Sequence, residues 1–260
     1  MALIENTLYG IEDKVAIAIQ RITMHCPESG LYVAFSGGKD SQVILDLVQR
    51  SGVKYDAHFN ITTVDSPELM KFIRKHYPYV ERHRPDKSMW ELIVEKRMPP
   101  TRKVRYCCEA LKEGGGAGRV VVTGIRWEES SKRSKRRYFE ACMRSKTKWY
   151  LNPIIDWSDQ DVWEYIHSRN LPYCELYDQG FSRIGCIGCP MAGKKRLTQF
   201  ARWPGFERSY RRAFDKCVVK RIVDGLPTQW ENGNEMFDWW MSDKAIKEDP
   251  NQGCLIFEDQ

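Results

Sequence analysis

The chain has 260 residues, and its 41 Lys and Arg against 35 Asp and Glu give a formal net charge of +6. Its 42% hydrophobic and 12% aromatic content is enough for a sizeable core, which excludes disordered, collagen-like and low-complexity classes. No apolar run approaches the roughly 20 residues of a membrane-spanning helix, and the N-terminus lacks the basic start of a signal peptide. We therefore expect a cytoplasmic protein with no membrane partner, whose nine cysteines are reduced.

Short strands and helices are expected to alternate along much of the chain. Apolar β-rich runs predict the strands, and apolar residues at helical spacing predict the helices. The expected strands cover residues 31–35, 55–61, 80–83, 119–124 and 149–153, and the expected helices cover 8–24, 43–48, 67–73, 89–96, 106–112 and 158–166. Such alternation predicts a doubly wound, mostly parallel α/β sheet, whose ligands bind at the carboxyl ends of its strands.

The last third of the chain differs in composition from the rest. Residues 171–193 are expected to form a loop rich in Gly, Pro and Cys, and residues 194–223 one or two basic helices. The remainder, residues 224–260, is acidic. We therefore expect an α/β domain over residues 1–193 and a helical C-terminal extension over residues 194–260.

A glycine-rich loop containing a lysine follows the first expected strand. Ser36-Gly37-Gly38-Lys39-Asp40-Ser41 joins this strand to a helix. The glycines allow backbone amides to close on an anion, and the helix N-terminus adds partial positive charge. Lys39 supplies a charge for phosphate oxygens, although the spacing is not that of the Walker-type loop. The pattern therefore predicts a phosphate-binding loop, and a strand-to-helix turn without a ligand is the alternative.

This loop resembles the pyrophosphatase loop of adenine-nucleotide α-hydrolase-like enzymes. Two later segments narrow the resemblance to the phosphoadenosine phosphosulfate (PAPS) reductase family. Thr123-Gly-Ile-Arg126 resembles the family's Gly-x-Arg stretch, whose arginine faces the anionic end of the nucleotide, and Asn152-Pro-Ile-Ile-Asp-Trp-Ser158 resembles the segment after its last strand. The motifs occur in the family's order over about residues 30–193. The resemblance implies an adenine nucleotide bound by Ser36, Gly37, Gly38, Lys39, Asp40, Ser41, Thr63, Asp65, Gly124 and Arg126.

Four cysteines form two pairs, Cys107-Cys108 and Cys186-Ile-Gly-Cys189. Four thiolates suit either zinc or a [4Fe–4S] cluster, and unmetallated thiols are the third alternative. Adjacent cysteines fit a zinc knuckle poorly, because neighbouring side chains diverge. The pairing resembles the iron–sulfur signature of the adenylylsulfate-reducing branch of the family, which has a lysine at the position of Lys112. The resemblance therefore implies a [4Fe–4S] cluster held by these four cysteines, with Lys112 beside it.

Cys254, the last of the nine cysteines along the chain, is of interest because reductases of this family attack sulfur with a C-terminal cysteine in a Glu-Cys-Gly-Leu-His context. Here Gly253 precedes the cysteine and no basic residue follows it, while Glu258 and Asp259 lie close by in sequence. A thiolate nucleophile needs an electropositive setting. We favour a passive tail cysteine over a nucleophile at this position.

Two stretches combine basic residues with aromatic ones. Residues 132–148 contain Lys132, Arg133, Lys135, Arg136 and Arg137, and we expect this stretch to bind an anion such as nucleotide phosphates, DNA or RNA. Residues 194–221 interleave ten basic residues with five aromatic ones. This second stretch fits nucleic-acid binding or an amphipathic helix with buried aromatics equally well.

Two mechanisms are consistent with the resemblance. In the first, ATP is cleaved between its α- and β-phosphates, an acceptor such as a nucleic acid is adenylated, and a sulfur donor displaces AMP. Lys39 would stabilise the departing pyrophosphate, Arg126 would face the phosphates, and Asp40 or Asp65 would hold Mg²⁺. In the second, adenylylsulfate (APS) or PAPS is reduced to sulfite by a cysteine thiolate, Cys254, and a thioredoxin-like reductant.

The complete loop, the poor match around Cys254 and the basic stretches favour the first mechanism, an ATP-pyrophosphatase-type sulfurtransferase. The cysteine signature and the long co-linear match favour the second. A non-catalytic nucleotide- or nucleic-acid-binding module with structural zinc is a third hypothesis. The sequence determines neither the sulfur donor and acceptor nor whether the chain forms a homo-oligomer.

Overall fold

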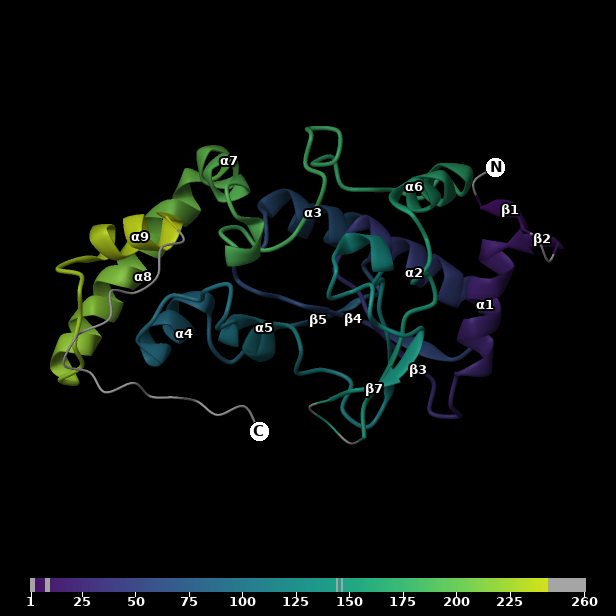
Figure 1. Ribbon diagram of the computed structural model, residues 1–260, viewed down its shortest axis with the longest axis horizontal. Helices are drawn as coiled ribbons and strands as arrows, with labels where there is room; N and C mark the ends of the chain where they lie inside the picture. The colour runs from purple at the N-terminus through teal and green to yellow at the C-terminus, as the bar shows by residue number, and fades with distance from the viewer. Residues whose placement is uncertain (1–2, 8–9, 144, 146, 243–260) are drawn as a thin grey trace. The chain divides into compact units, whose positions relative to one another are not determined.

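The computed structural model describes residues 3–7, 10–143, 145 and 147–242 (Figure 1). Contacts divide the chain into two compact units. The first unit comprises residues 1–86 and 107–186, and the second comprises residues 87–106 and 187–260. This division differs from the predicted boundary after residue 193, because a segment from the middle of the chain packs with the C-terminal helices.

A six-stranded sheet forms the centre of the first unit. Its order is β5-β4-β3-β6-β8-β7, and all neighbouring strands are parallel except β7 and β8. The strands are β3 (Leu31–Ala34), β4 (Tyr55–Asn60), β5 (Glu81–His83), β6 (Val120–Val122), β7 (Phe139–Ala141) and β8 (Trp149–Leu151). The predicted mostly parallel α/β sheet is therefore confirmed. Strand β7, which lies within the basic stretch 132–148, was not predicted.

Within the described residues, five helices accompany this sheet. They are α1 (Lys14–Met24), α2 (Lys39–Ser51), α3 (Pro67–His76), α5 (Tyr106–Leu111) and α6 (Asp159–Ser168). Helix α2 buries Val43, Ile44, Leu47 and Val48, and it packs against both α1 and α6. The predicted helix over residues 8–24 begins only at Lys14, because β2 (Gly10–Asp13) instead pairs with β1 (Ile4–Thr7) in a hairpin.

The second unit is helical. Helices α4 (Met89–Lys96), α7 (Lys195–Arg202) and α9 (Gly233–Ser242) pack on the long helix α8 (Pro204–Val223). Residues 194–223, for which one or two helices were predicted, thus form two. Helix α9 was not predicted. Trp240 donates a hydrogen bond from Nε1 to the Pro100 carbonyl at 2.7 Å, which ties the segment 87–106 into this unit. No helix within the described ranges has the length and apolarity needed to cross a membrane.

Candidate functional site

The glycine-rich loop lies between the carboxyl end of β3 and the start of α2, as predicted. Side-chain hydrogen bonds fix its shape. The Ser41 hydroxyl donates to the Gly38 carbonyl at 2.8 Å and accepts from the Ser36 amide at 3.2 Å. Gln42 Nε2 donates to the Gly37 carbonyl at 2.9 Å. The loop is therefore ordered by its own residues and by the first turn of α2.

Two glycines are required by the close packing around this loop. Gly37 has a φ of +73°, and a Cβ at this position would lie 2.7 Å from Leu69 and 2.8 Å from Ile73. Gly124 follows β6, and a Cβ there would lie 2.9 Å from Asp40 Cβ and 3.0 Å from the Asp40 carbonyl carbon. Only glycine satisfies the first position without strain. The second allows the end of β6 to approach the loop.

Lys39 and Arg126 meet at a single carboxylate next to the loop. Lys39 Nζ lies 2.7 Å from Asp159 Oδ1, and an Arg126 terminal nitrogen lies 2.9 Å from the same oxygen. Arg126 Nε also contacts Asp40 Oδ1 at 2.7 Å, and its other terminal nitrogen contacts Glu128 at 3.1 Å. Lys39 is 5% exposed and Arg126 is 3% exposed, so both cations are held in fixed positions.

Asp159 was not predicted as a site residue, although it stands in the first turn of α6. Partial burial works to raise the pKa of Asp159, but the hydrogen bond from Lys39 and the charges of Lys39 and Arg126 lower it overall. The pKa of Arg126 is raised, because the charges of Asp40 and Asp159 outweigh the effect of burial. Only the three-dimensional structure places this carboxylate beside the loop, since no local motif links residues 39 and 159.

Tyr177 is a second site residue that sequence reasoning missed. Its hydroxyl accepts a hydrogen bond from the Lys39 backbone amide at 2.9 Å. Burial raises the pKa of Tyr177, so its hydroxyl stays protonated at neutral pH. The Lys39 amide is one of the first N–H groups of α2, and these groups are the donors available to an anion. An anion bound at this amide would share it with Tyr177 or displace its hydroxyl.

The turn after β4 carries two of the predicted binding residues, Thr63 and Asp65. Thr63 has a φ of +64°, a left-handed conformation that is strained for a β-branched residue. Asp65 accepts hydrogen bonds from the Thr62 amide at 2.7 Å and from the Thr62 hydroxyl at 2.8 Å. The Asp65 carboxylate therefore has a local structural role, whereas the Asp40 carboxylate faces Arg126.

The cysteine pairs are divided between the two units. Cys107 and Cys108 lie on α5 and Cys186 ends the first unit, and all three are half-buried. The Lys112 ammonium is hydrogen-bonded to Cys186 and interacts with the charge of Cys108. The negative charge of the Cys186 sulfur raises the pKa of Lys112. The first unit thus brings Lys112 together with Cys108 and Cys186.

The fourth predicted ligand, Cys189, belongs to the second unit, where it precedes the short 3-10 helix η2 (Pro190–Ala192).

Cys186 also contacts the turn after β4, since its sulfur lies 3.5 Å from the Thr62 hydroxyl. Cys254, the predicted tail cysteine, lies outside the described residues.

The basic stretch after β6 is only partly available to an outside anion. Arg133 is paired with Glu129, and Arg136 is paired with Glu140. The three remaining residues of the predicted patch are Lys132, Lys135 and Arg137. All three are exposed, and within the described part of the chain the structure gives them no ion pair.

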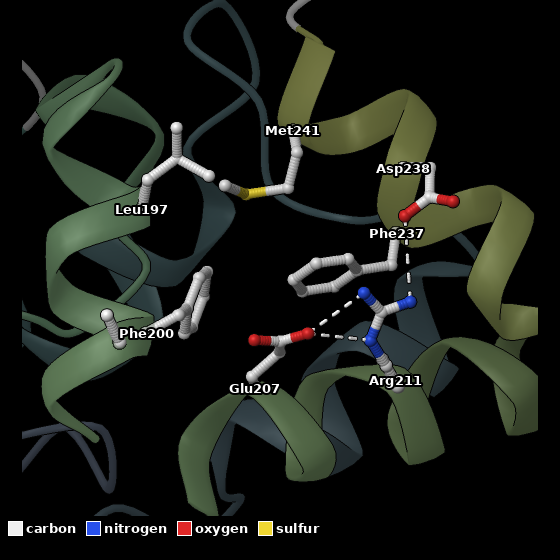
Figure 2. Close-up of a pocket in the computed structure, with 8 residues that line it drawn as sticks. Leu197, Phe200, Glu207, Arg211, Phe237, Asp238 and Met241 are labelled. Atoms are coloured by element: carbon white, nitrogen blue, oxygen red, sulfur yellow. Dashed lines mark hydrogen bonds and ion pairs between the residues drawn. The ribbon is translucent and has the colours of Figure 1, made fainter. Parts of the chain in front are cut away.

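Residues 194–221 fit the amphipathic-helix alternative. The aromatic side chains of Phe200, Tyr210 and Phe214 are buried in the core of the second unit, so they cannot stack on bases. Phe200 also lines a hollow of about 340 Å³. The Arg211 guanidinium lies over the Phe237 ring at this hollow, 4.0 Å from the ring centroid (Figure 2). Arg211 is also paired with Glu207 at 2.9 Å. This arginine therefore serves the packing of α8 against α9.

Comparisons with known proteins cover mainly the first unit. The phosphoadenosine phosphosulfate reductase domain family matches residues 30–192. An adenosine 5′-phosphosulfate reductase from Oceanobacillus iheyensis is 30% identical over 193 residues, which are 68% of this chain and 78% of that protein. An uncharacterised protein from Methanocaldococcus jannaschii is 34% identical over 169 residues, which are 61% of this chain but only 41% of that protein.

Among solved structures, a PAPS reductase from Candida auris in complex with phosphate is 22% identical, with a TM-score of 0.49, and the match covers 66% of this chain and 87% of that one. An FMN adenylyltransferase from Candida glabrata is 17% identical, with a TM-score of 0.48 and coverage of 67% and 61%.

The fold and the loop define an α/β protein with a glycine-rich loop at the carboxyl end of a central parallel strand. Because the family match spans more than half of the chain, the protein belongs to the phosphoadenosine phosphosulfate reductase domain family.

Proposed function

We propose that this protein is an enzyme that binds an adenine nucleotide with its anionic end against the loop, Lys39 and Arg126, and acts on it in a sulfur reaction. The two buried cations support the proposal, because an anhydride held beside them gains stabilisation as negative charge develops on its leaving group. Thr63, Asp65 and Gly124 line the same edge of the sheet and are the proposed remaining contacts.

ATP is the nucleotide that the site favours, and the observation that carries this choice is the set of carboxylates around the two cations. Asp40, Glu128 and Asp159 all contact Arg126 or Lys39, so these side chains have more negative than positive charge. A bare anion is repelled by this excess, whereas triphosphate chelated by Mg²⁺ is not, because carboxylate and phosphate oxygens are the ligands Mg²⁺ prefers. Asp40 and Asp159 are the proposed magnesium ligands.

In this reaction, cleavage between the α- and β-phosphates adenylates an acceptor, and Lys39 stabilises the pyrophosphate that leaves. The exposed residues Lys132, Lys135 and Arg137 are the proposed surface for an acceptor rich in phosphate, such as DNA or RNA.

We further propose that Cys107, Cys108, Cys186 and Cys189 hold a [4Fe–4S] cluster, which would supply a site for sulfur or electrons. The Lys112 ammonium supports this assignment, because a cluster with four thiolate ligands is negatively charged and Lys112 already interacts with Cys108 and Cys186. Thiolate ligands also suit zinc, so metal content is part of the test below.

Reduction of APS or PAPS to sulfite is the second candidate function. The observation that favours it is the 30% identity to an adenosine 5′-phosphosulfate reductase, together with similar matches to reductases of Staphylococcus haemolyticus and Neisseria meningitidis. This reaction needs a thiolate nucleophile, for which Cys254 is the candidate, and a thioredoxin-like reductant.

Product analysis distinguishes the two functions. Protein purified without oxygen is incubated with ATP and Mg²⁺, and separately with APS or PAPS and a dithiol, and pyrophosphate, AMP and sulfite are measured. The sulfurtransferase proposal predicts pyrophosphate from ATP and no sulfite. If the protein instead produces sulfite from APS or PAPS, and Cys254→Ser abolishes this activity, the sulfurtransferase proposal is wrong and the protein is a reductase. About four irons per chain, with little zinc, is the expected metal content.

A further inference from the structure

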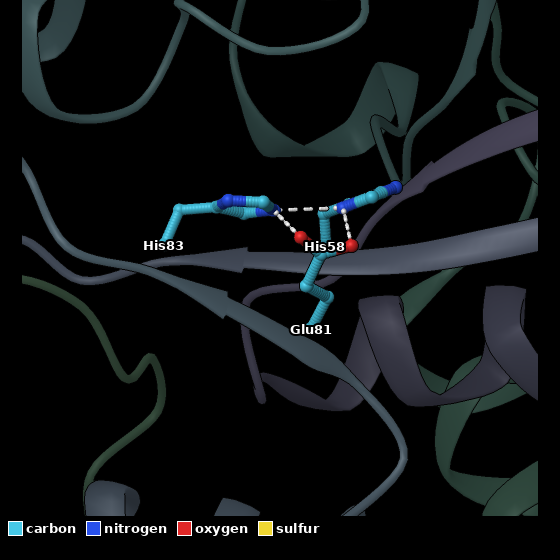
Figure 3. Close-up of side chains that lie close together, drawn as sticks. All are labelled: His58, Glu81 and His83. Carbon is cyan, nitrogen blue, oxygen red and sulfur yellow. Dashed lines mark hydrogen bonds and ion pairs between the residues drawn. The ribbon is translucent and has the colours of Figure 1, made fainter.

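A second group of chemically active side chains lies on one face of the paired strands β4 and β5. In their register His58 stands opposite Glu81, and Asn60 stands opposite His83. Because side chains of a strand alternate between the two faces, the side chains of His58, Glu81 and His83 share one face (Figure 3). In the part of the chain that the structure describes, no hydrogen bond or ion pair joins these three side chains to Lys39, Arg126 or the glycine-rich loop.

The donor atoms of these three side chains converge. His58 Nδ1 lies 2.8 Å from His83 Nε2. The Glu81 carboxylate oxygens lie 3.4 Å from His58 Nδ1 and 3.6 Å from His83 Nε2. One atom from each residue can be chosen so that all three lie within 4.8 Å of one another. Two imidazole nitrogens and one carboxylate are a ligand set typical of a zinc site with an open coordination position.

The surroundings of His58 prepare it to act as a ligand. Its other ring nitrogen, Nε2, contacts the Asp56 carboxylate, and Asp56 is in turn held by Arg119 at 2.7 Å. The ring stacks on Tyr32, with the ring centroids 4.1 Å apart. A proton shared with Asp56 fixes Nε2 as the donor, so Nδ1 presents its lone pair to His83 and Glu81. A carboxylate behind a histidine in this way orients and strengthens it as a metal ligand.

Two of the three residues, His58 and His83, line a cavity of about 340 Å³, together with Tyr32, Asn60 and Gly115. This space can admit a water molecule or a small ligand to the fourth position of a metal ion. Tetrahedral Zn–N bonds of about 2.0–2.1 Å place two ligand nitrogens roughly 3.3 Å apart. The imidazole of His83, whose side chain is 40% exposed, would need to move by only about half an ångström from its present position.

We propose that His58, Glu81 and His83 form a binding site for a divalent transition-metal ion, zinc by its donor set, with one coordination position open to the cavity. The two nitrogen ligands disfavour Mg²⁺ and Ca²⁺, which prefer oxygen donors. The site is separate from the proposed nucleotide reaction, so its presence does not depend on that proposal. A pair of histidines that only hydrogen-bond to each other is the competing explanation.

Zinc binding by the full-length protein tests this proposal. Zinc is titrated against a chromophoric chelator, and zinc per chain is measured after dialysis, in wild type, His83→Ala and Glu81→Gln. Because the cysteines also bind zinc, the comparison between variants isolates the proposed site. His76→Ala, an exposed histidine on α3, is the matched control.

We expect wild type and His76→Ala to retain one zinc equivalent more than His83→Ala and Glu81→Gln, whose affinity at this site falls at least tenfold. Titration with Co²⁺ should add visible bands without a sulfur charge-transfer band for this equivalent. Circular dichroism checks that each variant is folded, and Glu81 is exposed enough for Glu81→Gln to leave the fold unchanged. Wild-type zinc affinity in either His83→Ala or Glu81→Gln would overturn the proposal.

Discussion

Lys39 Nζ lies 2.7 Å from Asp159 Oδ1, and Arg126 forms an ion pair with the same oxygen at 2.9 Å. A carboxylate from the first turn of α6 therefore sets the positions of two cations that belong to α2 and to the segment after β6. The ion pairs that stabilise this arrangement join side chains that are far apart in sequence. We therefore expect Asp159 to affect anion binding at the proposed site, although it does not belong to the loop.

We predict that Asp159→Asn changes the preference of the site between bare and magnesium-bound anions. Removal of one negative charge should strengthen the binding of magnesium-free pyrophosphate by roughly two- to fivefold, because the two cations are then less compensated. Loss of a magnesium ligand should lower kcat/KM for ATP cleavage at least tenfold. Calorimetry with and without Mg²⁺ measures the first effect and pyrophosphate release the second. Weaker binding of magnesium-free pyrophosphate, or an unchanged kcat/KM for ATP cleavage, would contradict the role given to Asp159.

Gly37→Ala should destabilise the protein and Gly38→Ala should not. The backbone at residue 37 is left-handed, which is unfavourable for alanine, and a Cβ there would overlap Leu69 and Ile73. We therefore expect the free energy of unfolding to fall by roughly 1–3 kcal/mol or more. Gly38 has a φ of −78°, and a Cβ there meets its nearest atoms at 3.5 Å. Urea unfolding of both variants checks the difference, and a tolerant Gly37→Ala would count against the described loop conformation.

Stability at acid pH should depend on Asp161, whose side chain is 2% exposed and lies 2.9 Å from Lys14 Nζ. Burial works to raise the pKa of Asp161, but the hydrogen bonds from Lys14 and Ser158 lower it below its usual value of 3.8. A group with a depressed pKa contributes stability above its unfolded pKa and loses that contribution as the pH falls through its folded pKa.

Asp161→Asn should therefore be less stable than wild type by roughly 1–3 kcal/mol at pH 7, and the gap should narrow as the pH falls below about 4. Asp86→Asn, at an exposed position, is the control. Urea unfolding at a series of pH values measures both, and a gap that stays constant from pH 7 to pH 3 would show that the ion pair with Lys14 is not its source.

Cys186→Ser should remove the iron, whereas Cys26→Ser should keep it. Cys186 contacts Lys112 and the Thr62 hydroxyl, while Cys26 is a half-buried cysteine whose sulfur contacts only the carbonyls of Pro27 and Lys54 in the described hydrogen bonds. Iron and acid-labile sulfide per chain are measured after reconstitution without oxygen. Full iron content in Cys186→Ser would exclude this cysteine as a cluster ligand.

Local sequence patterns predicted the part of the site that is contiguous in the chain. The loop from Ser36 to Ser41 combines turn-forming glycines with a following apolar helix pattern, so its place between β3 and α2 could be predicted. Strand β7 escaped prediction because its apolar alternation extends over only three residues, Phe139–Ala141, within a basic stretch. Helix α9 was not predicted because it begins with Gly233 and Asn234, residues of low helix propensity, within an acidic segment.

Residues that act across the fold could not be found in this way. Asp159 and Tyr177 reach Lys39 because α6 and the loop after it fold back over the carboxyl end of the sheet. His58 and His83 meet because the register of β4 and β5 aligns them. Each of these contacts depends on strand order and register, which a single sequence does not specify.

Lys39 is proposed to act on the anionic end of a bound adenine nucleotide, and the rate of pyrophosphate release from ATP and Mg²⁺ is the decisive measurement of this role. Lys39→Ala is compared with Lys71→Ala, a variant at an exposed position of α3. We predict that Lys39→Ala lowers the rate at least a hundredfold, about 2.7 kcal/mol in transition-state stabilisation, and that Lys71→Ala keeps the wild-type rate. A wild-type rate in Lys39→Ala would contradict this role of Lys39.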